Sequence, residues 1–182
     1  MKRYHFCLCI GRFQPFHWGH FELVTFALAQ AEQVLILLGS HLNEPSLKNP
    51  WNANERETMI RGCFNPNEQS RLQFIPIRDH ETDEGWATDI YQQVKAIAPS
   101  QARFAIVGMP VAKSFWTVHC PYWDYLEKTR HPNINATEIR AAYFQHISVI
   151  ELQHQLPPSI GEYLRDFRST PVYQQLRQEY HQ

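Results

Sequence analysis

Two histidines near the N-terminus stand where they could act on a phosphate group. His17 and His20 are three residues apart at the predicted start of a helix, which would put both imidazoles on one helical face. Arg12, a few residues earlier, adds a permanently charged fork of hydrogen-bond donors. Donors of these kinds stabilise negative charge that accumulates on a reacting phosphoryl group. The segment is therefore predicted to bind phosphate and to assist its transfer.

The surroundings of the histidines decide between this prediction and plainer ones. An HxxH pair alone is common, either as ordinary surface or core histidines or as two metal ligands, although a zinc site would need at least one more convincing ligand. Here the pair follows Gly11, Arg12 and Pro15, between an apolar strand and a helix. We expect Gly11 to allow a sharp turn at the strand end, and the helix N-terminus to offer a positive pocket. This setting favours phosphate binding.

Apolar segments of strand length alternate with longer segments of helical period, which is typical of an α/β fold with a parallel sheet. Strands are predicted at residues 4–10, 33–39, 72–77, 103–108 and 123–127. Helices are predicted at residues 17–31, 53–64, 86–98, 137–145, 159–167 and 172–180. Asn52 and Glu55 resemble a capping box before the second helix, and prolines precede the last two. Because such sheets bind ligands beyond the carboxyl ends of their strands, the site is expected in the loops after residues 10, 39, 77 and 108.

Composition narrows the classes of protein that fit. The 182 residues are 43% hydrophobic, as expected of a folded globule, and 17 Lys plus Arg against 18 Asp plus Glu give a net charge of -1. No broad basic face is left for nucleic acid. The longest apolar run, at residues 34–38, is too short to span a bilayer and no signal segment opens the chain, so a cytoplasmic location is predicted. The four cysteines lack CxxC spacing and are predicted to be reduced packing residues.

The segment GRFQPFHWGH, residues 11–20, resembles the HxGH signature of the nucleotidyltransferase superfamily, a Rossmann-like group. Its RFQPFH wording is similar to archaeal-type nicotinamide-mononucleotide adenylyltransferases and to the adenylyltransferase domain of bifunctional bacterial adenylyltransferase/Nudix hydrolases. Cytidylyl- and pantetheine-phosphate enzymes usually carry a threonine-phenylalanine-aspartate version instead. The resemblance implies a Rossmann-like parallel sheet with helices on both faces.

A second signature stands near residue 137. Residues 133–140, NINATEIR, resemble the superfamily's isoleucine-serine-x-threonine-x-x-arginine motif, with Thr137 and Arg140 on its threonine and arginine. Read from the residues alone, Thr137 suits a helix start and Arg140 shares its face, so both could address triphosphate oxygens or be a plain cap and a solvated arginine. Asn135 and Ala136 depart from the motif, as residues 109–119 depart from the bacterial relatives. Further matches resemble the family in their order and spacing, at residues 39–40, 49–51, 54–56 and 75–79 and then at Trp86.

The resemblance assigns roles to residues of the whole chain. Those expected to be catalytic are Arg12, His17, His20, Thr137 and Arg140. Those expected to bind ATP are Gly11, Arg12, Phe13, His17, His20, Gly39, Ser40, Gly108, Asn135, Thr137 and Arg140. The mononucleotide is expected to contact Phe13, Asp79 and Trp86, with Trp86 stacking on the nicotinamide ring, although it could equally be a core residue. Lys48 and Lys113, both expected to lie in loops near the site, are only secondary candidates for phosphate, since isolated lysines are usually just solvated.

The implied reaction is transfer of AMP from ATP to nicotinamide mononucleotide, giving NAD and pyrophosphate, with Mg²⁺ held by the ATP phosphates and by no protein side chain. Two alternatives stay open: another acceptor, such as nicotinic acid mononucleotide, or a non-catalytic domain that senses ATP or NAD. A sensor would be expected to lose at least one of the signature residues, and the four residues His17, His20, Thr137 and Arg140 are all present.

Domain organisation is predicted as a nucleotidyltransferase domain at residues 1–150 and a C-terminal helical segment at residues 151–182, which packs on that domain or acts as a connector. The stretch from Tyr163 to Tyr173 resembles the connector to a Nudix hydrolase domain in bifunctional relatives, and no Nudix signature follows it in this sequence. A fused or lost Nudix domain, and a homo-oligomer by analogy with the family, both stay open.

Overall fold

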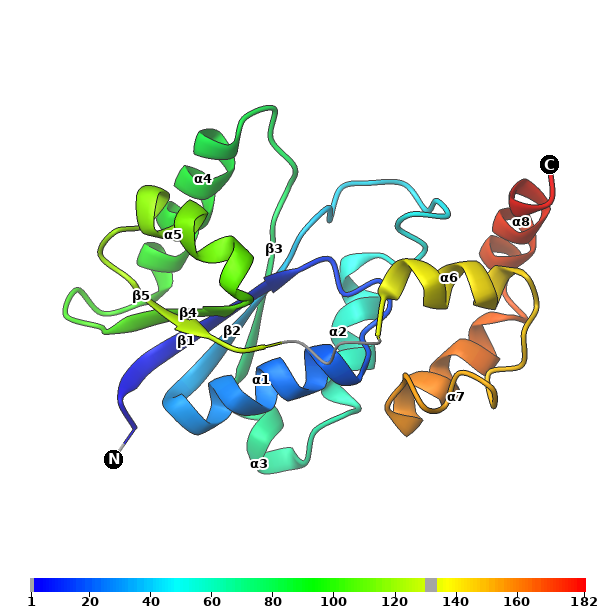
Figure 1. Ribbon diagram of the computed structural model, residues 1–182, viewed down its shortest axis with the longest axis horizontal. Coiled ribbons are helices and arrows are strands. Elements are labelled where there is room, and N and C mark those ends of the chain that lie inside the picture. Colours follow the sequence, from blue (N-terminus) through cyan, green and yellow to red (C-terminus); the bar gives the residue numbers. More distant parts are fainter. Residues whose placement is uncertain (1, 130–133) are drawn as a thin grey trace. The chain divides into compact units, whose positions relative to one another are not determined.

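The computed structural model describes residues 2–129 and 134–182, which form two compact units (Figure 1). Unit 1 consists of the described residues of segments 1–11, 22–41 and 70–130. Unit 2 consists of those of segments 12–21, 42–69 and 131–182. The chain therefore passes from one unit to the other several times, and helix α1 contributes residues to both.

Unit 1 is built on a parallel sheet of five strands. They are β1 (Tyr4–Gly11), β2 (Ala31–Leu38), β3 (Leu72–Pro76), β4 (Phe104–Gly108) and β5 (Asp124–Glu127), in the order β3-β2-β1-β4-β5. The central strands are near-continuous apolar runs, as expected where both faces of a parallel sheet are covered. All five predicted strands are confirmed, with ends that differ by at most two residues.

Helices cover both faces of this sheet. The connection through α1 (Trp18–Gln30) leads from β1 to β2 in one direction along the sheet, and the connection through α4 (Asp83–Ile97) leads from β3 to β4 in the other. Because such crossovers are right-handed, the unit 1 part of α1 and helix α4 lie on opposite faces (Figure 1). The predicted α/β, Rossmann-like class is thereby confirmed. Buried apolar side chains on the α4 side make a core of Leu8, Leu35, Leu37, Ile77, Ile90, Val94, Phe104, Ile106, Trp116, Cys120 and Trp123.

In unit 1, the predicted start of one helix was wrong and two short helices were missed. Helix α4 begins at Asp83 and not at residue 86, with Thr82 as its N-cap accepting a hydrogen bond from Gly85 N. Glycine at the third helical position hides this start, because a capping box would have glutamate there. The short helix η1 (Pro110–Ala112) and helix α5 (Lys113–His119) were not predicted either, because the β-branched and aromatic residues of α5 are weak helix formers.

Unit 2 is helical. It contains the start of α1, α2 (Ala53–Arg61), α3 (Pro66–Gln69), α6 (Ala136–Phe144), α7 (Pro158–Phe167) and α8 (Pro171–Tyr180). The predicted capping box of α2 is confirmed in both directions: Glu55 N donates to Asn52 Oδ1 at 3.0 Å and Asn52 N donates to Glu55 Oε2 at 2.8 Å. Helix α2 ends at Arg61, three residues earlier than predicted, and α3 was not predicted. Helices α7 and α8 both begin with proline, as expected.

Aromatic side chains make the core of unit 2. Tyr143 lies 5.1 Å from Tyr173 and 6.2 Å from Trp51 between ring centroids, and its hydroxyl donates to Leu164 O. Trp51 in turn contacts Phe167 at 5.7 Å, which joins α6 and α7 to the loop before α2. The predicted division of the chain at residue 150 stays a prediction. Among the described residues, no helix is both long enough and apolar enough to cross a bilayer.

Candidate functional site

The predicted site residues fall into two groups, one in each unit. Unit 2 holds Arg12, Phe13, His17, His20, Lys48, Asn135, Thr137 and Arg140. Unit 1 holds Gly11, Gly39, Ser40, Asp79, Trp86, Gly108 and Lys113.

The loop after β1 turns at Phe13, not at Gly11. Gly11 still belongs to the strand, paired with Leu38, and no described glycine has a positive φ angle. Phe13 instead adopts a φ of 52°, a left-handed conformation that costs a bulky residue about 1–3 kcal/mol. Its buried ring meets the edge of the His20 ring at 4.9 Å and tilts against Phe16 at 6.0 Å. Phe13 therefore supports His20 from one side.

The two histidines form a stacked pair. Their ring centroids lie 3.7 Å apart with an interplanar angle of 23°. His17 immediately precedes the helix and is fully buried, and its carbonyl accepts from Phe21 N at 3.0 Å. Helix α1 thus begins one residue later than predicted, but both imidazoles lie on the same side of its first turn. The burial of His17 and the stacking of His20 on it restrict both rings, and electrostatic stabilisation of a reacting phosphate requires donors that are fixed in this way.

Arg140 is buried and bonded mainly to backbone oxygens. Its Nε donates to Leu47 O at 3.1 Å, and its Nη1 donates to Gln14 O and to Ala136 O. Its Nη2 donates to Thr137 Oγ1 at 3.2 Å. These bonds tie α6 to the loop after β1 and to the loop before α2. A phosphate contact by Arg140 would therefore use its remaining N–H or exchange one of these bonds.

Arg12 and Arg140 concentrate positive charge in unit 2. Burial, and next the charge of Arg12, lower the pKa of Arg140 to about 10. Within the described part of the chain, neither guanidinium has a carboxylate at ion-pair distance. Two partly buried cations without a counter-charge favour the binding of an anion. This local charge is compatible with the net charge of -1 of the whole chain.

Sequence reasoning did not assign roles to Gln14 and Arg56, two residues that hold the loop after β1 in place. Gln14 is buried, and its side chain donates to Trp51 O at 2.7 Å and accepts from Trp51 N at 3.2 Å. Arg56 is fully buried and donates from Nη1 to Arg12 O at 2.8 Å and from Nε to Asn52 O at 3.2 Å. Buried loop carbonyls need hydrogen-bond donors, and here the side chains of Gln14 and Arg56 supply them. The only available signal was that both residues stand within segments that resemble the family, residues 11–20 and 54–56.

Helix α6, which begins within the second signature, has a different N-cap from the one predicted. Asn135 is the N-cap of α6 and accepts from Thr137 N at 2.9 Å, so Thr137 is not the cap. An amide oxygen caps at least as well as a hydroxyl, which frees Thr137 Oγ1 to receive Arg140. Asn133 lies outside the described residues.

A small cavity of about 150 Å³ adjoins the first turn of α6. It is lined by Leu47, Thr137, Arg140, Ala141, Phe144 and Tyr180. Lys48 is exposed.

In unit 1, predicted residues gather at the carboxyl ends of three adjacent strands. Gly39 N donates to Gly11 O at 3.0 Å, which joins the ends of β1 and β2. Ser40 follows with a left-handed φ of 54°, and its hydroxyl donates to Asp79 Oδ1 at 2.9 Å in the loop after β3. A strained serine held by a carboxylate at a strand end is the kind of feature found at binding sites.

Three other predicted residues of unit 1 have structural partners. Trp86 is partly buried, with ring centroids 5.5 Å from Trp116 and 6.0 Å from Phe115, so it packs α4 on α5. At Gly108, an added Cβ would overlap the hydroxyl oxygen of Tyr125, so a larger residue there would require the Tyr125 side chain to move. Lys113 is not a loop residue as expected but begins α5, and its ammonium pairs with Glu127 at 2.7 Å.

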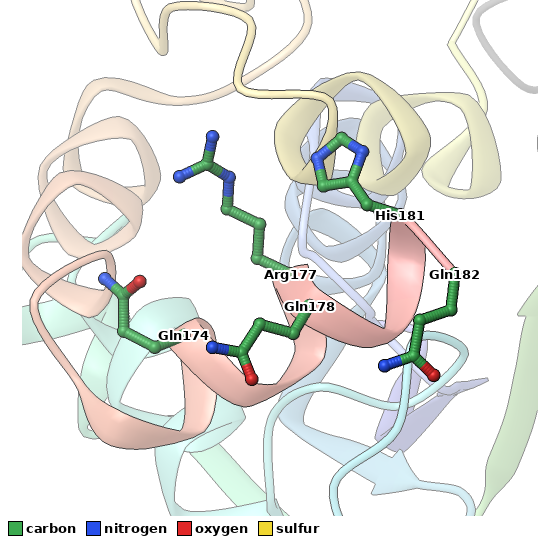
Figure 2. A pocket seen from close by; sticks show the side chains of 5 residues that line it. All are labelled: Gln174, Arg177, Gln178, His181 and Gln182. Atoms are coloured by element: carbon green, nitrogen blue, oxygen red, sulfur yellow. The ribbon is translucent and has the colours of Figure 1, made fainter.

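Away from these residues, unit 2 has a hollow of about 450 Å³ along α8. It is lined by Gln174, Arg177, Gln178, His181 and Gln182 (Figure 2). None of the predicted site residues lines it. Within residues 2–129 and 134–182, no group of three or more His, Cys, Asp or Glu side chains is arranged so that it could hold a metal ion.

Comparison with known families gives one match over most of the chain. The sequence profile described as cytidylyltransferase-like matches residues 8–142. A relative from Acinetobacter baylyi, named nicotinamide/nicotinic acid mononucleotide adenylyltransferase, is 33% identical over 99% of this chain and 95% of its own length. A relative from Thermococcus onnurineus, named nicotinamide-nucleotide adenylyltransferase, is 29% identical over 88% of this chain and 82% of its own.

Solved structures include a bifunctional NMN adenylyltransferase/ADP ribose pyrophosphatase from Francisella tularensis. It superposes with a TM-score of 0.87 at 29% identity over 98% of this chain. A second structure of the Francisella protein, complexed with AMP and a manganese ion, gives a TM-score of 0.88. The chain spans 54% and 53% of these two chains, about half of the bifunctional protein.

Proposed function

The chain belongs to the cytidylyltransferase-like family, and we propose that it is a nicotinamide-nucleotide adenylyltransferase. In this reaction a phosphate oxygen of nicotinamide mononucleotide forms a bond to the α-phosphorus of ATP. The bond from that phosphorus to the oxygen bridging to the β-phosphate breaks, so that NAD and pyrophosphate are the products. The family resemblance predicted from the HxGH segment agrees with these matches.

The observation that carries this proposal is the cluster of fixed cationic and imidazole donors in unit 2. Arg12 and His17 lie on the loop after β1, His20 follows in the first turn of α1 and stacks on His17, and Arg12 is close enough to Arg140 to lower its pKa. The donors are placed by the fold itself, so they need no reorganisation when charge moves onto the leaving pyrophosphate. We assign His17, His20 and Arg12 to the phosphates, and Thr137 and Arg140 to the same triphosphate and to holding the loop.

The residues of unit 1 are proposed to bind the rest of the substrates. Gly11, Gly39, Ser40 and Gly108 would meet ATP, and Asp79 and Trp86 the mononucleotide. Phe13 and Asn135 act in this proposal through the backbone and the helix cap that they shape. Lys48 and Lys113 remain secondary candidates, and the pairing of Lys113 with Glu127 argues against a main role. A Mg²⁺ ion, held by phosphate oxygens of ATP, would neutralise part of the triphosphate charge.

Nicotinic acid mononucleotide is the second candidate acceptor, because the Acinetobacter baylyi relative carries both mononucleotides in its name. The cytoplasmic location stays a prediction, and a homo-oligomer and a fused or lost Nudix domain both stay open.

Pyrophosphate release decides between these functions. The purified protein is given ATP and Mg²⁺ with nicotinamide mononucleotide, with nicotinic acid mononucleotide, or with no acceptor. Release with the amidated mononucleotide, and NAD as the second product, is the expected result. Release with the acidic mononucleotide alone would move the assignment to the second candidate. No release with either, from protein that still binds ATP, would contradict the proposal and favour a sensor.

The stacking role of Trp86 is tested in the same assay. Because stacking of a base on an aromatic ring contributes about 1–3 kcal/mol, Trp86→Ala is expected to raise the KM for the mononucleotide about tenfold or more. The KM for ATP should change little. Equal changes in both constants would mean that Trp86 only packs α4 against α5.

A further inference from the structure

Three polar side chains in unit 1 converge on Asp89, beside the loop that carries Asp79 and the first turn of α4 that carries Trp86. His80 Nε2 lies 2.9 Å from Asp89 Oδ2, and Arg78 Nε lies 3.5 Å from the same oxygen. Gln93 Nε2 donates to the other oxygen, Asp89 Oδ1, at 3.0 Å. Asp89 stands in the second turn of α4, whereas Arg78 and His80 come from the segment between β3 and that helix. The cluster therefore connects the loop to the helix that follows it.

The distances decide which partner His80 has. A separation of 2.9 Å between Nε2 and a carboxylate oxygen requires the proton on Nε2, since two acceptors would repel. With that proton in place, Nε2 cannot also accept from Arg78 Nε, 3.2 Å away, so the Arg78 charge acts on Asp89. His80 is thus held in one tautomer at this nitrogen, and its ring orientation is set by Asp89.

Burial and charge make this contact durable. The side chains of His80 and Asp89 are each only 18% exposed, against 60% for Arg78. Burial would raise the pKa of Asp89, but the hydrogen bonds from His80 and Gln93 and the charge of Arg78 outweigh it and hold that pKa below its usual value. The carboxylate accordingly stays charged at neutral pH and keeps its hydrogen bonds.

Gly85 lies next to both the Thr82 cap and the His80 ring in the first turn of α4. A Cβ at position 85 would lie 3.0 Å from Thr82 Oγ1 and 3.5 Å from His80 Nδ1. Thr82 also accepts from Gly85 N, so the loop is fixed to α4 at two points, His80 and the cap. These side chains border a hollow of about 450 Å³ beside the helix start.

Asp79 lies directly before His80 and is bonded in a different place. Its Oδ1 accepts from Ser40 Oγ, at the end of β2, whereas His80 is bonded to α4. We propose that His80 and Asp89 are positioning residues, which hold the segment from Asp79 to Trp86 in the arrangement that binds the mononucleotide. They act through Asp79 and Trp86 and need not touch the substrate. This inference rests on the proposed function. It gives roles to His80 and Asp89, to which the family resemblance assigned none.

The test compares steady-state constants of wild type, His80→Ala, Asp89→Ala and the double variant with nicotinamide mononucleotide and ATP. Each single variant is expected to raise the KM for the mononucleotide about tenfold, the effect of losing one charge-assisted hydrogen bond. The KM for ATP and kcat should stay within about twofold, a split that general loss of structure would not give. The double variant should be no worse than Asp89→Ala alone, because replacing Asp89 already removes the contact that His80→Ala breaks.

Two controls keep the result interpretable. Asp89→Asn retains an acceptor for His80 and should restore most of the lost affinity, which also covers the case in which Asp89→Ala unfolds. Asp124→Ala removes another hydrogen-bonded carboxylate of unit 1, the partner of Tyr4, on β5 at the opposite edge of the sheet from β3, and should leave the mononucleotide KM unchanged. Folding of each variant is checked by thermal unfolding.

The outcomes separate the inference from the function. Active wild type with unchanged mononucleotide KM in folded His80→Ala and Asp89→Ala would overturn the positioning role alone. Equal losses for ATP and mononucleotide would also overturn it. Wild type that binds ATP but turns over no mononucleotide would overturn the proposed function, and the positioning role with it.

Discussion

In unit 2, Arg140 and Arg56 are buried and donate to backbone carbonyls, whereas in unit 1 Arg78 and Lys113 are exposed and pair with carboxylates. The first arrangement fixes a charge when the chain folds, because each guanidinium is held by carbonyls of separate backbone segments. The second depends on side chains that water and salt can replace. The difference indicates that these two arginines of unit 2 hold their charge in place, and it predicts where substitutions should cost most.

The largest effect is expected at His20, in the fixed cluster of unit 2. His20→Ala should lower kcat about 10²- to 10³-fold, the usual cost of removing one preorganised donor, with the fold intact. His154→Ala, which replaces an exposed histidine of the same unit, is the matched control and should have wild-type activity. Turnover by His20→Ala equal to wild type would show that the stacked pair has no part in the reaction.

Arg140→Lys tests whether backbone bonding holds unit 2 together. Lysine keeps the charge but cannot reproduce the fork that reaches Leu47 O, Gln14 O and Thr137, so unpaired carbonyls remain. We expect a loss of about 2–3 kcal/mol in the free energy of unfolding, measured by urea denaturation. Arg165→Lys, at an exposed position, should change it by less than about 0.5 kcal/mol. Equal stability of the two variants would remove the contrast between buried and exposed arginines.

A pair of glycine substitutions sharpens the comparison through packing. Gly108→Ala in unit 1 should lower the free energy of unfolding by about 1–3 kcal/mol, because the new Cβ would overlap the Tyr125 hydroxyl. Adding Tyr125→Phe removes that oxygen and should recover part of the loss. Gly161→Ala in α7 of unit 2 meets only Val149, at 3.5 Å, and should stabilise by about 0.5–1 kcal/mol. A loss that is just as large in the double variant Gly108→Ala/Tyr125→Phe would point to another cause.

The smallest effect is expected at Lys113. Its pair with Glu127 is exposed on both sides, so Lys113→Gln should cost at most about 1 kcal/mol of stability, and less at high salt. The KM for ATP should remain close to that of wild type. A rise of tenfold or more in that KM would instead place Lys113 among the phosphate ligands and weaken the contrast between the units.

Much of the fold could be predicted from local pattern. The five strands are short apolar runs, and the capping box at Asn52 and Glu55 depends only on residues three apart. The start of α4 could not be predicted, since Gly85 occupies the position at which the capping pattern expects glutamate. Helix α5 was missed because its residues are weak helix formers, and packing of Trp116 on Trp86 stabilises it.

For the site, the sequence by itself determined which residue types are available and where the loops that carry them fall. The HxGH segment, the second signature and the parallel α/β pattern are all readable from spacing, because spacing fixes which side chains share a helix face or a strand end. Only the tertiary structure decided that Phe13 rather than Gly11 makes the turn and that Asn135 rather than Thr137 caps α6. The same holds for Arg140, which bonds to loops 93 and 126 residues away in the chain. These outcomes depend on which carbonyls and charges meet after folding, and no local pattern contains that information.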